Sequence, residues 1–318
     1  MGYIIGLDVG GTKCAVTLAK AAENDRPLIL SKSQFPTPSR DPQGTLERFL
    51  TEIDSVLSEN KLSYSDISGI GISCGGPLDS KNGVVLSPPN LPAWDGIRIC
   101  EYFEEKTGIK ARLQNDANAC AVAEWKWGAG KGMQSVIFLT FGTGLGAGLI
   151  LDGRLYCGAN DNAGEIGHVR LDPDGPVGYG KRGSCEGFCS GGGLKQLGIK
   201  AMLEGGESCE LYKAANGDPE KVSAKLIASL ADTGDRICLD LYRRLGDNLG
   251  RTLAILCDIL DPQALILGGI YIRADHLLSD SLQKVLNSEA LLPCKVLKAG
   301  LGENVGDYAA LSIAEGDF

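Results

Sequence analysis

Two glycine-rich segments and one polar cluster contain the residues of this sequence that could bind an anion and move a proton. They are Gly6-Leu7-Asp8-Val9-Gly10-Gly11-Thr12-Lys13, Phe141-Gly142-Thr143-Gly144-Leu145-Gly146-Ala147-Gly148 and, between them, Asn115-Asp116-Ala117-Asn118. A glycine turn lets backbone N–H groups approach an anion closely, because no Cβ intervenes. Two such turns facing each other, with a carboxylate between them, indicate phosphoryl transfer.

Each of these features also has a plainer explanation. A glycine hairpin can be a turn without a ligand, and Asp116 can be the N-cap of a helix. Asp8 argues for a ligand, because an aspartate at the end of an apolar strand needs a partner, and a hydrated magnesium ion on nucleotide phosphates is a natural one. Two asparagines beside Asp116 are more than a cap requires.

Neither glycine segment has both the residues and the following helix that a common nucleotide-binding motif requires. Gly6 to Lys13 ends in Gly-Thr-Lys, where a P-loop requires Gly-Lys-Ser or Gly-Lys-Thr. Gly142 to Ala147 matches the glycine spacing of a dinucleotide fingerprint. Both segments precede a predicted strand instead of a helix, so the sequence predicts neither a P-loop enzyme nor a Rossmann dehydrogenase.

The pattern of apolar residues predicts the elements that position these groups. A strand, a tight turn and a second strand over residues 3–19 recur over residues 136–151, which indicates an internal duplication. The pattern also predicts helices at 45–57, 119–127 and 235–260, strands at 67–73, 111–114, 148–151 and 264–267, and an ordered loop at 86–96. Asp116 lies near a helix N-terminus, where we expect the positive end of the helix dipole to favour its ionised form.

Composition limits the class of protein. The chain has 318 residues, 43% of them hydrophobic, which is enough for two domains with separate cores. A net charge of -9 opposes binding to nucleic acid or to anionic membranes. The start of the chain lacks signal-peptide features, and the 11 scattered cysteines form no CxxC pair. We therefore expect a cytoplasmic protein without nucleic-acid or membrane partners.

A set of motifs that occur in order carries a family resemblance. The set is Asp8 to Lys13, Pro89-Asn90-Leu91-Pro92-Ala93-Trp94-Asp95-Gly96, Asn115 to Ala119, Gly142 to Gly148 and Ala163-Gly164-Glu165-Ile166-Gly167-His168. It resembles the ROK family (repressors, open reading frames, sugar kinases) of the hexokinase and actin-like ATPase superfamily. The resemblance spans nearly the whole chain, since Gly302 to Ala314 is similar to the closing segment of that family.

The resemblance implies an α/β fold of the two-domain actin-like ATPase (ribonuclease H-like) type, with duplicated mixed sheets and a cleft between the domains. The small domain would be residues 1–117, completed by a C-terminal helix at about 303–318, and the large domain residues 118–302. The implied protein is a homodimeric, glucokinase-like kinase that uses ATP and Mg²⁺. It would phosphorylate a hexose or N-acetylhexosamine at a primary hydroxyl, and the sequence does not select the sugar.

Two alternatives come from the same family, namely a sugar-binding transcriptional regulator and a non-catalytic sugar sensor. Regulators of the family carry an N-terminal helix-turn-helix domain, whereas this acidic chain opens directly on the first glycine segment. The intact Asp8, Asp116 and glycine turns argue against a sensor. The kinase is therefore the preferred interpretation.

Carried over residue by residue, the resemblance implies that Asp116 is the base that accepts the proton of the sugar hydroxyl. The implied sugar-binding residues are Asn90, Asn115, Glu165, His168 and Glu186. The implied nucleotide-binding residues are Asp8, Gly10, Gly11, Thr12, Lys13, Gly142, Thr143, Gly144, Gly268 and Gly269, with Asp8 reaching Mg²⁺ through water. For His168, a structural hydrogen bond is the alternative role.

The sequence departs from the family at its zinc-binding loop. Many members bind structural zinc through the histidine of the Gly-His motif and three cysteines, and here Val177, Tyr179 and Ser184 occupy the cysteine positions. None of them can supply a thiolate ligand. A rearranged site using Cys157, Cys185 or Cys189 with His168 is the alternative. We expect no structural zinc and a loop held by packing and hydrogen bonds.

Overall fold

The computed structural model describes residues 2–23, 25–316 and 318. The chain divides into two compact units, and each is described here by itself. The first unit comprises Met1–Phe138, Gly148–Ala163 and Ala299–Phe318, and the second comprises Leu139–Ala147 and Gly164–Lys298. The predicted domain boundary at residue 117 divides the chain differently from these units, and it stays a prediction.

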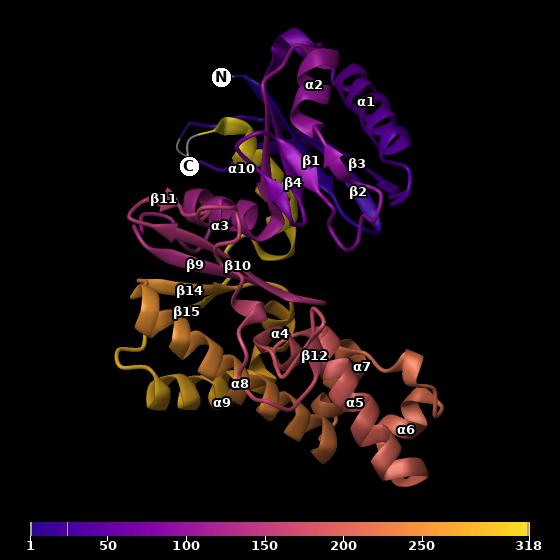
Figure 1. Cartoon of the computed structure of the whole chain (residues 1–318), viewed down its shortest axis with the longest axis vertical. Coiled ribbons are helices and arrows are strands. Elements are labelled where there is room, and N and C mark those ends of the chain that lie inside the picture. Colours follow the sequence, from indigo (N-terminus) through magenta and orange to yellow (C-terminus); the bar gives the residue numbers. More distant parts are fainter. Residues whose placement is uncertain (1, 24, 317) are drawn as a thin grey trace. The chain divides into compact units, whose positions relative to one another are not determined.

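A five-stranded sheet in the order β3-β2-β1-β4-β8 forms the centre of the first unit (Figure 1). Its strands are β1 (Tyr3–Val9), β2 (Lys13–Lys20), β3 (Leu28–Pro36), β4 (Ile67–Cys74) and β8 (Ala111–Asn115). β1 pairs antiparallel with β2 and parallel with β4, and β4 pairs parallel with β8. The predicted hairpin over residues 3–19 and the two predicted strands beyond it are confirmed.

Helices cover both faces of this sheet. They are α1 (Pro42–Glu59), α2 (Ile99–Thr107), α3 (Asp116–Trp127) and α10 (Val305–Glu315). Leu7 belongs to the same hydrophobic cluster as Phe49 of α1, whereas Ile4 clusters with Leu311 of α10. Because successive side chains of a strand point to opposite faces, Asp8 shares the face of Ile4, on which α10 packs.

Two paired glycines bring α10 close to the sheet. Gly6 of β1 lies opposite Gly71 of β4 in the strand register. A Cβ added at Gly71 would lie 2.0 Å from the carbonyl oxygen of Ala310, and one at Gly6 would lie 3.0 Å from the Cβ of Ala310. Larger side chains would therefore push the helix away from the strand that ends in Asp8.

A small sheet supports the proline-rich loop that was predicted at 86–96. Its strands are β5 (Leu78–Asp79), β6 (Val84–Leu86) and β7 (Asp95–Ile97), so the ends of the predicted loop belong to β6 and β7. Leu91 and Trp94 are 1% and 0% exposed and anchor the loop in the core. Asn90, which directly precedes Leu91, is exposed. The loop is thus ordered by buried apolar side chains.

The second five-stranded sheet has the order β11-β10-β9-β14-β15, which repeats the arrangement of the first. Its strands are β9 (Val136–Phe141), β10 (Leu145–Leu151), β11 (Arg154–Leu155), β14 (Ala264–Leu267) and β15 (Lys295–Lys298). The repeated order agrees with the predicted duplication. The strand predicted at 148–151 begins earlier, at Leu145, because the glycine turn itself is only three residues long.

Helices make up most of the second unit. They are α4 (Cys185–Phe188), α5 (Gly191–Gly205), α6 (Glu210–Ala215), α7 (Ala224–Asp232), α8 (Arg236–Leu260) and α9 (Ile270–Glu289). A short hairpin, β12 (Val177–Gly178) and β13 (Lys181–Arg182), precedes α4. Short 3-10 helices in the two units are η1 (Tyr64–Asp66), η2 (Ile166–His168), η3 (Gly206–Ser208), η4 (Pro219–Lys221) and η5 (Gly302–Asn304).

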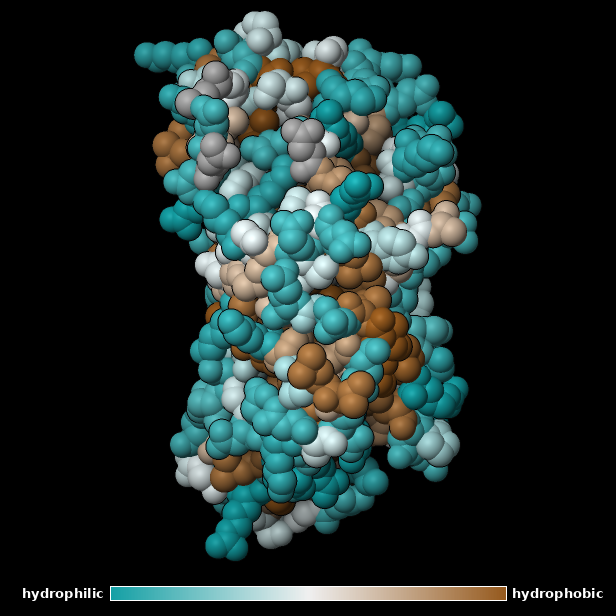
Figure 2. Space-filling model, turned by 90° about the vertical axis from the view of Figure 1, so that its left-hand side faces the viewer, coloured by the Kyte–Doolittle hydropathy of each residue, from teal (hydrophilic) through white to brown (hydrophobic). Residues whose placement is uncertain are grey.

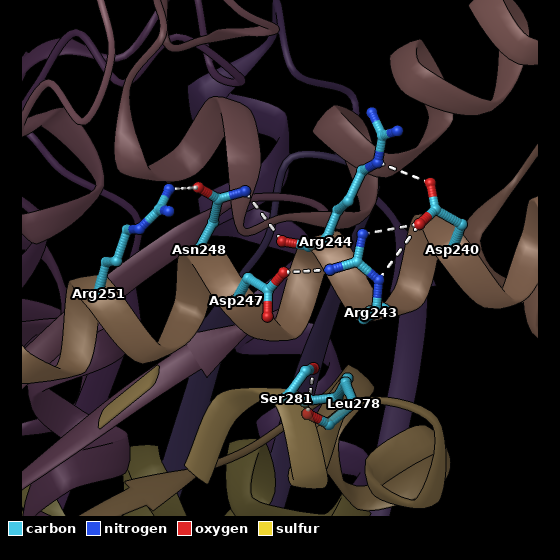
Figure 3. A network of polar contacts seen from close by, with 8 residues as sticks. All are labelled: Asp240, Arg243, Arg244, Asp247, Asn248, Arg251, Leu278 and Ser281. Carbon is cyan, nitrogen blue, oxygen red and sulfur yellow. Dashed lines mark hydrogen bonds and ion pairs between the residues drawn. The ribbon is translucent and has the colours of Figure 1, made fainter. Parts of the chain in front are cut away.

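The long helix α8 packs closely on α9. A Cβ added at Gly246 of α8 would lie 2.1 Å from the Oγ of Ser281 in α9, so this crossing requires glycine. On the α8 surface, Arg243 donates hydrogen bonds to Asp240 on one side and Asp247 on the other (Figure 3). These ion pairs are exposed to solvent, so they contribute little to the stability of the fold.

Hydrophobic residues gather in one area of the face shown in Figure 2, and hydrophilic residues cover most of the remainder. In the second unit, Ile259, Leu291 and Leu292 are 72%, 94% and 70% exposed. Within the described ranges, no helix is both long and apolar enough to span a bilayer.

Candidate active site

Asp116, the predicted catalytic base, and Asp8, the predicted Mg²⁺ ligand, lie at the carboxyl ends of parallel strands in the first unit. The register pairs Asp8 of β1 with Ser73 of β4, and the next residue, Cys74, with Asn115 of β8. Asp116 follows Asn115 directly as the first residue of α3. The carboxyl ends of parallel strands are the usual place for ligands in open α/β sheets.

Asn115, and not Asp116, is the N-cap of α3. Its Oδ1 accepts a hydrogen bond from the backbone N–H of Ala117 at 3.0 Å. Asp116 occupies the first helical position, and its Oδ1 accepts from the same N–H at 2.8 Å. The explanation of Asp116 as the helix cap is therefore wrong, and its exposed carboxylate is available to a ligand.

The pKa of Asp116 is raised, which contradicts the expectation that the helix dipole would favour the ionised form. Loss of hydration to the protein packed around this carboxyl raises the pKa more than the N–H of Ala117 lowers it. Its side chain is nevertheless open to solvent. A carboxylate that is accessible and more basic than usual is suited to accept a proton.

The pKa of Asp8 is also raised, to about 6. Burial is the largest cause, followed by the negative charges of Asp116 and Asp307. The positive charges of Lys32 and Lys13 act in the opposite direction. A carboxylate that sits among other carboxylates in this way is stabilised by a cation, and oxygen donors of this kind suit Mg²⁺.

The turn between β1 and β2 is tight and lies against the loop that carries Asn90. A Cβ at Gly10 would lie 2.5 Å from the carbonyl oxygen of Lys13, and one at Gly11 would lie 2.6 Å from the Cβ of Asn90. The side chains of Thr12 and Lys13 are exposed beside them. The structure thus brings one predicted sugar-binding residue next to the predicted nucleotide turn of the first unit.

Thr37 is a further residue of this turn that the sequence did not reveal. Its Oγ1 donates a hydrogen bond to the carbonyl of Gly10 at 2.7 Å, and its N–H donates to the carbonyl of Thr12 at 3.0 Å. Thr37 follows the end of β3, so its contact depends on strand pairing that no local pattern indicates.

The second glycine turn is held by the start of α5. Gly142 N–H donates to the carbonyl of Gly144 at 3.1 Å, and the carbonyls of Gly142 and Thr143 accept from Gly191 and Gly192 at 2.8 and 3.1 Å. The sequence run Ser190-Gly191-Gly192-Gly193 was the available signal for this support, and it was not singled out.

Gly269 lies against the same turn. Its φ is +58°, and a Cβ there would lie 2.0 Å from the carbonyl oxygen of Phe141. The structure therefore brings Gly268 and Gly269, at the end of β14, together with the turn formed by Gly142, Thr143 and Gly144.

Three predicted sugar-binding residues lie in one region of the second unit. Glu165 directly precedes η2 and His168 is its last residue, and the N–H of His168 donates to the carbonyl of Glu165 at 3.0 Å. Glu186 is half-buried, and its Oε2 accepts from the N–H of Leu145 at 3.1 Å. A Cβ at Gly167, between Glu165 and His168, would lie 3.4 Å from the Cβ of Glu186.

Packing and hydrogen bonds hold the loop that contains Val177, Tyr179 and Ser184. Ser184 is buried, its Oγ accepts from the N–H of Gly187 at 3.1 Å, and it donates to the carbonyl of Gly178 at 3.3 Å. The Tyr179 ring meets the His168 ring edge-on at 5.9 Å. Among the described residues, no group of three or more His, Cys, Asp or Glu is arranged to hold a metal ion.

The predicted site residues thus form two sets. Asp8, Gly10, Gly11, Thr12, Lys13, Asn90, Asn115 and Asp116 lie in the first unit, and Gly142, Thr143, Gly144, Glu165, His168, Glu186, Gly268 and Gly269 lie in the second. Each set contains a glycine turn and polar side chains that can bind hydroxyl groups. The roles assigned to the individual residues stay predictions.

Comparison with known proteins gives consistent matches along the chain. The ROK family model matches residues 4–316. A glucokinase of Streptomyces coelicolor is 32% identical over 321 residues, which cover 99% of this chain and 98% of the relative. The crystal structure of a ROK family glucokinase from Streptomyces griseus in complex with glucose and AMPPNP superposes with a TM-score of 0.80 at 30% identity, covering 99% of each chain.

A transcriptional regulator is also among the matches. The DNA-binding transcriptional dual regulator NagC of Escherichia coli K12 is 25% identical over 294 residues. The alignment covers 91% of this chain and 68% of the regulator.

Proposed function

The chain belongs to the ROK family, and we propose that this ATP-dependent sugar kinase phosphorylates a hexose or N-acetylhexosamine at a primary hydroxyl. The observation that supports the proposal most is the environment of Asp116. Its carboxylate is exposed, it is relieved of the capping role by Asn115, and its pKa is raised.

Asp116 would act as the general base. A carboxylate of raised pKa binds a proton more strongly, so it can accept the proton of a sugar hydroxyl as that oxygen attacks. Asn90, Asn115, Glu165, His168 and Glu186 are the residues that the family resemblance assigns to the other hydroxyls of the sugar. Amides, carboxylates and an imidazole together offer both donors and acceptors to these groups.

The glycine turns would bind the phosphates of ATP through backbone N–H groups. The empty space beside Gly142, where an added Cβ would meet no heavy atom within 4 Å, fits a ligand that approaches the backbone. Asp8 would hold Mg²⁺, because a hydrated cation would offset the negative charges gathered around its carboxylate. When bound, Mg²⁺ neutralises charge on the transferred phosphoryl group.

An assay of ADP release across a panel of hexoses tests this proposal. The panel should contain glucose, mannose, fructose, N-acetylglucosamine and N-acetylmannosamine, with ATP and Mg²⁺ in excess. We expect sugar-dependent ADP release that Asp116→Asn slows by roughly a hundred- to ten-thousand-fold, with the highest kcat/KM identifying the substrate. ADP release that does not depend on any sugar would contradict the proposal.

The regulator among the matches supports a second candidate, a sugar-binding protein that does not transfer phosphate. Such a protein would bind a sugar in calorimetry and release no ADP. The same panel therefore separates the two functions.

A further inference from the structure

One carboxylate of the second unit contacts both the predicted nucleotide turn and the predicted sugar-binding segment. The Oε2 of Glu186 accepts the N–H of Leu145, the residue that ends the Gly142–Gly144 turn, at 3.1 Å. The Cβ of Glu186 lies against Gly167, between Glu165 and His168. Within the part of the chain that the structure describes, the other oxygen, Oε1, has no hydrogen bond.

The turn is shaped to admit this carboxylate. A Cβ added at Gly144 would lie 2.7 Å from the Oε2 of Glu186, whereas one at Gly142 would meet no heavy atom within 4 Å. A side chain at position 144 would therefore force the carboxylate of Glu186 to move. A methyl group at position 142 would displace no described side chain.

A carboxylate can hold two donors at once, one on each oxygen. Here one oxygen is occupied by the backbone of the turn and the other is free, on a side chain that is only half-buried. A sugar hydroxyl on Oε1 would fix the rotamer of Glu186, and a fixed Oε2 would hold Leu145 and the turn before it in one conformation. Ordering the turn in advance would lower the cost of nucleotide binding.

We propose that Glu186 couples the two substrates, so that a bound sugar orders the Gly142–Gly144 turn and tightens the binding of ATP. Glu186 is then a positioning residue for the nucleotide in addition to a ligand of the sugar. The proposal rests on the proposed function. It adds that sugar binding strengthens nucleotide binding within that same site.

The test measures how much the sugar tightens nucleotide binding. The affinity for AMPPNP with Mg²⁺ is measured by calorimetry without sugar and with a saturating hexose, and the ratio of the two dissociation constants is the coupling factor. We expect a factor of about 5 or more in the unmodified protein. Glu186→Ala should bring it close to 1, and Glu186→Gln, which keeps an acceptor for Leu145, should restore part of it.

His168→Ala is the matched control, because it removes a predicted sugar contact that has no hydrogen bond to the turn. It should weaken sugar binding and keep the coupling factor once the sugar is saturating. In steady-state kinetics, Glu186→Ala should raise the KM for ATP and the KM for the sugar, and His168→Ala only the latter. Circular dichroism and melting curves show that each variant is folded.

Two results overturn the proposal and leave the kinase function intact. They are a coupling factor near 1 in an unmodified protein that phosphorylates sugar, and an unchanged factor in Glu186→Ala. Failure of the unmodified protein to phosphorylate any hexose overturns the proposed function itself, and the inference with it.

Discussion

At the scale of single residues, the charge of Asp8 has a consequence for stability. Its pKa is raised from 3.8 to about 6 in the folded state, whereas the unfolded chain has the ordinary value. Between these values the folded protein binds a proton that the unfolded chain has lost, so the free energy of unfolding falls as the pH rises through this window. Above about pH 6 the folded state carries the whole cost of the crowded charge.

We therefore expect Asp8→Asn to raise the free energy of unfolding at pH 7.5 by on the order of 1 kcal/mol, and to change it little at pH 3.5. The same variant should lose activity if Asp8 holds Mg²⁺. Denaturant melts at the two pH values measure the difference, with Asp95→Asn on the surface as the control. A less stable Asp8→Asn protein at pH 7.5 would show that the charge is favourable where it lies.

The second prediction at this scale concerns zinc. Because Val177, Tyr179 and Ser184 replace the thiolates, we expect substoichiometric zinc in elemental analysis of protein purified without added metal. Chelation that spares Mg²⁺ should leave activity unchanged. One tightly bound zinc per chain, with loss of activity when it is removed, would show that Cys185 or Cys189 has taken over as a ligand.

At the scale of elements, the two glycines of the second turn can be told apart. Gly142→Ala places a methyl group in open space, so we expect it to raise the KM for ATP and to leave the KM for the sugar and the melting temperature nearly unchanged. Gly144→Ala must displace Glu186, so it should raise both KM values. An unchanged KM for ATP in Gly142→Ala would mean that Gly142 is not near the phosphates.

The sequence was most informative about the helices and strands. Local patterns predicted the strand-turn-strand repeat and the helix after Asp116, because alternation and glycine turns are local signals. Contacts that join distant segments were not predictable in this way. Thr37 braces the first turn and Gly191 the second through long-range pairing, and the pKa of Asp116 depends on protein packed around it, which a dipole argument from its own helix omits.

At the scale of the whole molecule, we predict that the small and large domains expected from the sequence close over a bound sugar. Ligand that binds the folded state raises its stability by mass action, so a good substrate at 100 times its Kd should add about 2.7 kcal/mol. Hydrogen exchange in the 86–96 loop, which carries Asn90, should slow at saturating sugar. Unchanged exchange in this loop would contradict closure.

Assembly into a homodimer stays a prediction of the family resemblance. The exposed Ile259, Leu291 and Leu292 lie in the second unit, where the N–H of Leu291 donates to Asp258 next to Ile259. Light scattering gives the oligomeric state directly.

The central claim is that Asp116 accepts a proton while a phosphoryl group moves from ATP to a sugar. The most direct measurement is the rate of sugar phosphate formation by the unmodified protein and by Asp116→Asn at saturating ATP, Mg²⁺ and sugar, with the product identified by phosphorus NMR. We predict a phosphate monoester on the primary hydroxyl and a rate lower by roughly a hundred- to ten-thousand-fold in the variant, which should still fold and bind the sugar. Nearly full turnover by Asp116→Asn would contradict the account.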